Sequence, residues 1–439
     1  MSVRDELLQA PLSALCARLS LPVVAGLLLI GAATFADAAF VGHYATTDAL
    51  GGILLGFPVT MLNSAVAGLI GSGCAAVLSR AIGASDAQKA RRVCGAFVVW
   101  TVVASLLVTG AVLLWAEPML GWLGATGAML SEGALYLRIV FAGAVVQNFV
   151  FGASFLIRGE GRMSGAMALL GGGSVLNVLL DGVLVAGMSM GAEGAAYATL
   201  FTQVATGLAT ALFLWRDDGA LSMRRWRLTM APSLAREVLR DGAAAMLMYG
   251  MAMLQQAIAF RVVASHGTSS AVVFMGAYLR LIMLGMIPMW AIAMAVQPLV
   301  GVCHGAGLHQ RVGRAVSVFA RYATLIGVLV GSVALVAPRA VLGLLLTDTQ
   351  VIGQHVHAFR WLMAPFPLLA AQLVIASALV SIGKGAHASV LLVARNLVLL
   401  LPAVLILPRI LGIEGVWLAF VVTEVLSFGI AIVFWRKLR

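Results

Sequence analysis

Two aspartates, Asp37 and Asp181, interrupt long apolar stretches of this 439-residue sequence. The stretch from Leu21 to Val41 contains no ionisable residue except Asp37, and its 21 residues are enough, as a helix, to cross a hydrocarbon core about 30 Å thick. A carboxylate inside such a segment costs on the order of 3 kcal/mol, so acids there usually face a bundle interior or a watery cavity. We therefore expect Asp37 to be functional.

The second acid lies in the apolar segment GGGSVLNVLLDGVLVAG, where Asn177 and Asp181 share one helix face because they are four residues apart. Two carboxyl groups that converge in a low-dielectric pocket cannot both ionise cheaply, which favours a bound proton. Asn177 and the hydroxyl of Thr199 could hydrogen-bond either form, or supply neutral oxygens to Na⁺. The alternative interpretation is that Asp181 only caps a helix end beside Gly182.

The composition indicates which elements hold these residues. Hydrophobic residues make up 62% of the chain and charged residues 10%, whereas soluble domains carry about 25% charged residues. Apolar runs of this length exclude an outer-membrane barrel, whose strands alternate over about 10 residues. The sequence predicts an all-α polytopic membrane protein with twelve transmembrane helices. The expected spans are 21–43, 49–78, 93–115, 132–157, 164–187, 191–215, 241–265, 270–300, 316–338, 352–381, 388–410 and 412–435.

The net charge of +11 is distributed in a pattern typical of membrane topology. Most Lys and Arg residues fall in the N-terminal segment, in every second loop and in the C-terminal tail, which is the positive-inside pattern. This distribution predicts cytosolic termini and a lipid bilayer, not nucleic acid, as the partner of the basic residues. The four cysteines form no C-x-x-C pair, and the histidines show no metal-ligand spacing, so no metal site is expected.

Repeated motifs divide the chain into two similar halves. The segment 191–194, Gly-Ala-Glu-Gly, recurs as Gly-Ile-Glu-Gly at 412–415, and Trp215 followed by Arg216 recurs as Trp435 followed by Arg436. Each half has an even number of spans, so the halves should be related by an axis along the membrane normal, with a cleft between them suited to alternating access. The predicted organisation is an interfacial segment (1–20), an N-lobe (21–215), a cytosolic linker (216–240), a C-lobe (241–435) and a tail (436–439).

The repeat fails at the acids. The second-half counterpart of the Asp181 segment, ARNLVLLLPAVLIL, contains Asn396 but no carboxylate. The cation site is therefore expected in the N-lobe alone. Three second-half arginines are candidate partners for Glu424 in the twelfth span: Arg261, Arg280 and Arg395.

Four segments of the chain, ADAAFVGHYATTDALGG, LNVLLDGVLVAGMSMGAEGAAYAT, GEGR and MAVQPLVGVCHGAG, resemble the multidrug and toxic compound extrusion (MATE) transporters, in particular the DinF-like branch. The resemblance extends from about residue 15 to 436. It implies two six-helix lobes, and export of amphipathic, often cationic compounds in exchange for H⁺ or Na⁺. It also implies a monomer in the bacterial inner membrane, and no enzymatic activity.

The resemblance implies particular roles for individual residues. Asp37, Asn177, Asp181 and Thr199 match the family's N-lobe cation site, and Pro22 matches a first-helix proline associated with bending. The C-lobe Na⁺ site of the NorM-like branch has no acidic counterpart here, which favours protons as the coupling ion. Two alternatives stay open: Na⁺ coupling at the same N-lobe site, and a flippase for lipid-linked saccharides from the same superfamily. A membrane-embedded enzyme lacks any supporting motif.

Overall fold

The computed structural model describes residues 3–219 and 221–438, and all regular elements in these ranges are helices. Eleven of them are long and apolar enough to cross a membrane, or twelve if the bent pair α5 and α6 forms one span. The two helices of this pair meet at Gly143 and are inclined by 56°. The prediction of an all-α polytopic membrane protein is confirmed.

The helices of the first half precede those of the second half without interleaving. The first half contains α1 (Val3–Gln9), α2 (Leu12–Tyr44), α3 (Thr47–Gly83), α4 (Ala87–Trp122), α5 (Gly127–Ala142), α6 (Ala144–Gly159), α7 (Met163–Asp181), the π-helical segment η1 (Gly182–Gly187) and α8 (Gly191–Trp215). The second half contains the short 3₁₀ helix η2 (Met223–Arg225), α9 (Pro232–His266), α10 (Ser269–Gly305), α11 (His309–Val336), α12 (Pro338–Leu342), α13 (Thr349–Met363), α14 (Phe366–Ser381), α15 (Gly385–Val393), the π-helical segment η3 (Ala394–Leu400), α16 (Leu401–Leu411) and α17 (Ile413–Leu438).

Several helices begin earlier than the apolar runs predicted, most of all α2 and α9. Helix α2 begins at Leu12, within the expected interfacial segment, and α9 begins at Pro232, within the expected linker. Proline is favoured at the first position of a helix because the N–H that it lacks would be unpaired there. Apolar residues mark the part of a helix that lies in the hydrocarbon core, whereas the ends beyond it depend on capping and packing.

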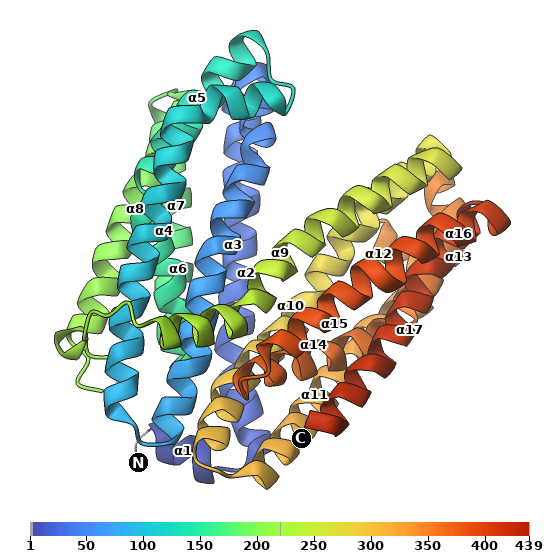
Figure 1. Ribbon diagram of the computed structural model, residues 1–439. Coiled ribbons are helices and arrows are strands. Elements are labelled where there is room, and N and C mark those ends of the chain that lie inside the picture. Colours follow the sequence, from blue (N-terminus) through green and yellow to red (C-terminus); the bar gives the residue numbers. More distant parts are fainter. Residues whose placement is uncertain (1–2, 220, 439) are drawn as a thin grey trace.

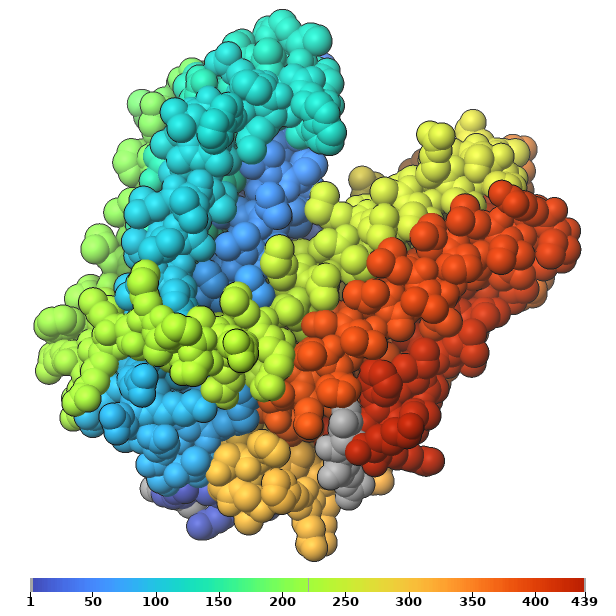
Figure 2. All heavy atoms as spheres, viewed as in Figure 1, coloured from blue at the N-terminus to red at the C-terminus, as the bar shows by residue number. Residues whose placement is uncertain are grey.

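The helices form two lobes that meet at one end and diverge at the other (Figure 1). Helices α2 to α8 form the N-lobe and α9 to α17 form the C-lobe, while α1 and the end of α17 lie where the lobes meet. The space-filling view shows a wide cleft that opens at the diverging end, with α3 and α5 on one wall and α9 on the other (Figure 2). We refer to the two ends of the molecule as the closed end and the open end.

Small residues bring the helix backbones of the two lobes into direct contact at the closed end. A Cβ atom added to Gly242 of α9 would overlap the carbonyl oxygen of Leu69 in α3, and one added to Gly73 of α3 would overlap the carbonyl oxygen of Val238 in α9. Close backbone approach at small residues is a common form of helix packing in membranes. Larger side chains at these two glycines would force the lobes apart.

Candidate functional site

Asp37 and Asp181 lie together inside the N-lobe. Asp37 is in the last third of α2, Asp181 is the last residue of α7, and these two helices pack against each other. The two carboxyl groups are close enough for each to influence the charge of the other. Asp181 is fully buried and Asp37 is half-buried. Two acids that are far apart in the sequence therefore form one pair.

The hydrogen bonding of this pair is incomplete. Within residues 3–219 and 221–438, neither carboxyl oxygen of Asp181 has a hydrogen-bond partner. A buried carboxylate without a donor is strongly unfavourable. A single proton shared between two adjacent carboxyl groups supplies the missing donor, as in other carboxyl pairs that cannot both ionise. The geometry is thus suited to holding a proton.

Three further side chains belong to the surroundings of the pair. Thr199 of α8 donates its hydroxyl to a carbonyl oxygen of its own helix at 3.0 Å. Tyr136 of α5 lies near Thr199 and near both aspartates. Asn177, one turn before Asp181, has a buried amide nitrogen without an acceptor in the described part of the chain. The structure therefore gathers the four predicted side chains in one region but bonds Asn177 to none of the others.

Tyr136 was not predicted from the sequence. It is a single tyrosine in an apolar segment, where most tyrosines only pack. Its position beside the acid pair depends on the packing of α5 against α8, which has no signature in the sequence.

The helix that carries Asp181 changes its pitch directly after this residue. Residues Gly182–Gly187 form a π-helical segment, and the side chain of Asp181 makes no capping hydrogen bond. Capping is therefore not what holds Asp181 in place. π-Helical segments occur often at functional sites because they change the direction in which side chains project.

Pro22 lies inside α2, which runs as one helix from Leu12 to Tyr44. Proline removes a backbone hydrogen bond and is a common position for a kink. Helix α2 packs against α7 of its own lobe and also against α10 of the C-lobe. A change in bend at Pro22 would move Asp37 relative to the C-lobe, and this role of Pro22 stays a prediction.

The C-lobe contains a partly buried acid that has a basic partner. Glu424 of α17 forms an ion pair with Arg395 of η3, which identifies its partner among the three candidate arginines. Gln372 of α14 donates to the carbonyl oxygen of Glu424 at 3.0 Å and accepts a hydrogen bond from Ser427 at 2.9 Å. Arg280 is exposed. Because Arg395 balances the charge of Glu424, we interpret these two residues as a structural ion pair and not as a second cation site.

A buried ion-pair network connects the lobes at the closed end. Arg80 of α3 donates to Asp241 at 2.6 Å and to Glu237 at 2.9 Å, both on α9. It also donates to the carbonyl oxygen of Ser381 in α14 at 3.1 Å. Asp241 is fully buried and receives a second hydrogen bond, at 3.2 Å, from Arg240. These charge-assisted bonds cross the lobe boundary and stabilise the closed end.

Helix α1 forms a further connection between the lobes at this end. Arg4 of α1 donates to the carbonyl oxygen of Ile82 at the end of α3, in the N-lobe. Arg311 of α11, in the C-lobe, donates to the carbonyl oxygens of Leu7 at 3.1 Å and Ala10 at 2.6 Å. Leu7 is only 2% exposed. This segment, expected along the membrane surface, therefore packs against protein from both lobes.

Two helical lobes that diverge around a cleft, joined at one end and with an acid pair in one lobe, are typical of a membrane transporter. The sequence model of the MatE family matches residues 22–183 and 244–405, and the chain belongs to this family, whose members are transporters and not enzymes. The two matched ranges begin 222 residues apart (244 − 22) and end 222 residues apart (405 − 183), which confirms the internal repeat.

Individual relatives cover nearly the whole chain. The FAD transporter of Shewanella oneidensis is 26% identical over 442 residues, covering 98% of this chain and 96% of the relative. The multidrug export protein MepA of Staphylococcus haemolyticus is 22% identical, covering 96% of this chain and 92% of the relative. A solved structure described as the outward-facing conformation of a multidrug resistance MATE family transporter has a TM-score of 0.91 at 24% identity, with coverages of 98% and 97%.

Proposed function

We propose that the protein exports amphipathic, often cationic compounds across the bacterial inner membrane in exchange for protons. The observation that carries this proposal is the Asp37–Asp181 pair, in which a bound proton would satisfy oxygens that otherwise have no donor. The similarity to MepA, a multidrug export protein, supports the substrate class.

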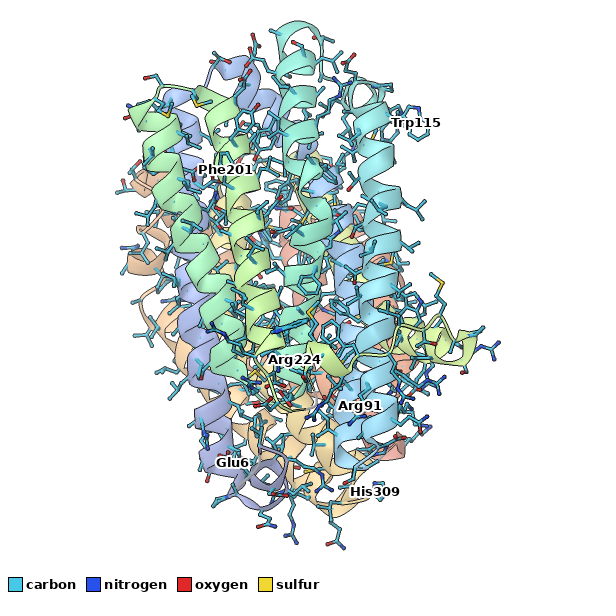
Figure 3. The ribbon with its side chains drawn as sticks, turned by 90° about the vertical axis from the view of Figure 1, so that its left-hand side faces the viewer. Glu6, Arg91, Trp115, Phe201, Arg224 and His309 are labelled. Atoms are coloured by element: carbon cyan, nitrogen blue, oxygen red, sulfur yellow. The ribbon has the colours of Figure 1, made fainter. Side chains whose placement is uncertain are left out.

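The orientation follows from the charges at the two ends. Arg91, Arg224 and His309 lie toward the closed end, whereas Trp115 and Phe201 lie toward the open end (Figure 3). Because basic residues stay on the cytosolic side, we place the closed end and both termini in the cytosol. In this orientation the cleft opens to the outside, and the structure represents the state that releases substrate and takes up protons.

The coupling follows from the charge of the acid pair. With few protons bound, the pair is anionic and attracts a lipophilic cation from the cytosol or the inner leaflet. Protonation from the outside removes this attraction, favours a rearranged α2 near Pro22 and releases the compound. The cycle then requires the closed end to open, which breaks the contacts of Arg80 with Asp241 and Glu237.

Protons are favoured over Na⁺ by the available ligands. Sodium needs several oxygen ligands, whereas one proton shared by the two carboxyl groups is enough to give the Asp181 oxygens a donor. The Na⁺-coupled alternative would use the same two carboxylates together with Asn177 and Thr199.

Transport with one gradient at a time tests this proposal. Liposomes that contain the purified protein are loaded with ethidium, and the movement of the dye is followed under a pH gradient alone or an Na⁺ gradient alone. We expect ethidium to move when the pH gradient is imposed and not when the Na⁺ gradient is imposed. Movement driven by Na⁺ alone would replace protons with sodium as the coupling ion, and movement of labelled lipid without dye would favour the flippase. No response to either gradient would contradict the proposed exporter.

A second candidate substrate is an anionic flavin nucleotide. The S. oneidensis relative is an FAD transporter, and Arg280 is exposed near the face of α10 that carries Met294. Met294 accepts a hydrogen bond from Arg158 of the N-lobe, so this face of α10 is turned toward the cleft side. Inclusion of FAD in the same liposome assay distinguishes the two, because a cation exporter would not move FAD.

A further inference from the structure

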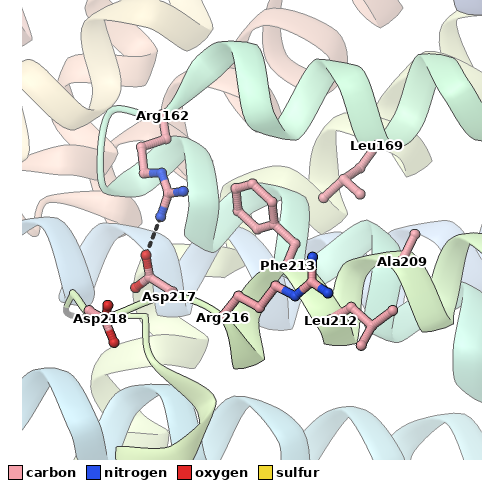
Figure 4. A pocket seen from close by; sticks show the side chains of 8 residues that line it. All are labelled: Arg162, Leu169, Ala209, Leu212, Phe213, Arg216, Asp217 and Asp218. Carbon is pink, nitrogen blue, oxygen red and sulfur yellow. Dashed lines mark hydrogen bonds and ion pairs between the residues drawn. The ribbon is translucent and has the colours of Figure 1, made fainter.

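A pocket of about 420 Å³ lies on the flank of the N-lobe, where α7 begins and α8 ends (Figure 4). One part of its lining is apolar and is formed by Leu169 of α7 together with Ala209, Leu212 and Phe213 of α8. Leu212 is 55% exposed, so this wall is accessible from the side of the protein. A pocket of this kind can accept an extended apolar chain.

Two of the charged residues that line the pocket neutralise each other. Arg162 forms an ion pair with Asp217 at 2.5 Å, and its guanidinium group also lies over the ring of Phe213, 4.6 Å from the ring centre. The dashed line in Figure 4 marks this ion pair. Arg162 and Asp217 thus form a fixed border of the pocket with little net charge.

The other two charged residues of the lining, Arg216 and Asp218, are available to a ligand. Both are exposed, and neither side chain has a hydrogen-bond or ion-pair partner in the ranges that the structure describes. The Arg216 side chain extends toward Ala209 and Leu212, while Asp218 lies on the opposite side of the Arg162–Asp217 pair (Figure 4). The pocket therefore offers one unpaired cation and one unpaired anion at separate positions.

The position of these charges along α8 matches the boundary of a bilayer. Helix α8 ends at Trp215, which is 52% exposed and is covered in part by the guanidinium group of Arg224, 5.3 Å from its ring centre. Exposed tryptophan and arginine at the end of a spanning helix are typical of the headgroup region. Arg216 and Asp218 then lie at headgroup level, and Leu212 and Ala209 lie one and two turns deeper.

We propose that this pocket binds a phospholipid with a zwitterionic primary-amine headgroup, phosphatidylethanolamine. Its phosphate pairs with Arg216, its ammonium group donates to Asp218, and one acyl chain lies along Leu169, Ala209 and Leu212. Phosphatidylglycerol has no ammonium group for Asp218, and phosphatidylcholine has no N–H to donate, so the pocket should prefer the ethanolamine lipid. This lipid would belong to the inner leaflet in the orientation given under the proposed function, on which the headgroup preference does not depend.

The site is tested by native mass spectrometry of the purified protein with phosphatidylethanolamine, phosphatidylcholine or phosphatidylglycerol in matched micelles. We expect saturable retention of phosphatidylethanolamine above the other two. Arg216→Gln and Asp218→Asn should each weaken it about threefold to fivefold, the range expected for exposed charge pairs. The matched controls Arg236→Gln and Asp48→Asn remove exposed charges elsewhere and should leave retention unchanged.

Two outcomes would overturn the proposal. Equal retention of all three lipids by the wild-type protein would mean that the headgroup is not recognised. Sensitivity to Arg216→Gln without sensitivity to Asp218→Asn would reduce the site to a phosphate contact. Neither result bears on ethidium transport under a pH gradient, so the failure of this site and the failure of the proposed function are distinguishable.

Discussion

Replacement of Asp181 by Asn is expected to reduce export driven by a pH gradient to the background of empty liposomes. Asparagine has nearly the same size but neither binds nor releases a proton, so the pair that Asp181 forms with Asp37 loses its coupling function. The fold should persist, because the substitution removes a fully buried carboxylate whose oxygens lack donors. We expect the free energy of unfolding to stay constant or rise by about 1–3 kcal/mol. The measurements are ethidium counterflow and thermal unfolding of the same preparation.

Asp37→Asn should give the same loss of transport, since both carboxyl groups belong to one proton site. Asp48→Asn is the matched control, because Asp48 is exposed in the first turn of α3, next along the chain. It should keep transport near the wild-type level. Full proton-driven export by either the Asp37 or the Asp181 variant would contradict the coupling scheme.

Substitution of Arg80 by Gln is expected to open the closed end. Among the described residues, the change leaves the buried Asp241 with Arg240 as its one partner, and breaking a buried ion pair in this way costs about 3–5 kcal/mol. This energy is lost only in the state in which the lobes meet at this end, so the population shifts toward the state open to the cytosol. The native thiol of Cys303 reports the shift, because it is fully buried in α10 and lies 3.8 Å from the carbonyl oxygen of Leu7.

The measurement is labelling of Cys303 by a membrane-impermeant maleimide in inside-out vesicles, with the modified cysteine identified by mass spectrometry. We expect at least tenfold faster labelling in Arg80→Gln, which corresponds to about 1.4 kcal/mol. Arg92→Gln, which changes an exposed arginine of α4, should label at the wild-type rate. Adding Asp241→Asn to Arg80→Gln should restore part of the protection, since no unpaired acid stays buried. Unchanged labelling of Cys303 in Arg80→Gln would show that Arg80 does not stabilise the closed end.

The parts of the site that could be predicted are those that have a local energetic cost. A carboxylate in an apolar run is unfavourable wherever the run is placed, so Asp37 and Asp181 are recognisable before any fold is known. The internal repeat and the spacing of the spans predicted two lobes, because both are properties of the residue order along the chain. The sequence also indicated that the acid pair belongs to the N-lobe, because the second-half counterpart of the Asp181 segment contains no carboxylate.

The parts that could not be predicted depend on contacts between distant segments. Arg80 and Glu237 lie in basic, polar regions that the sequence assigns to the cytosol, where most charges are only solvated, and Asp241 is the first residue of the span that follows. Their burial results from the packing of α3 against α9. Similarly, three arginines were candidates for Glu424, and Arg395 is its partner within a π-helical segment, whose pitch a regular helical projection does not represent.

The way in which α1 is held has a practical consequence for handling the protein. Both lobes form hydrogen bonds with this part of the chain. Arg311 of the C-lobe donates to the carbonyl oxygens of Leu7 and Ala10, and Arg4 of α1 donates to the carbonyl oxygen of Ile82 in the N-lobe. A purification tag or fluorescent reporter fused ahead of α1 would be attached directly to surfaces that must separate and rejoin in every turnover. Such a fusion would alter the kinetics that it was meant to observe. Helix α17 also ends at the closed end, but it packs against helices of the C-lobe, so a reporter after α17 is attached to one lobe.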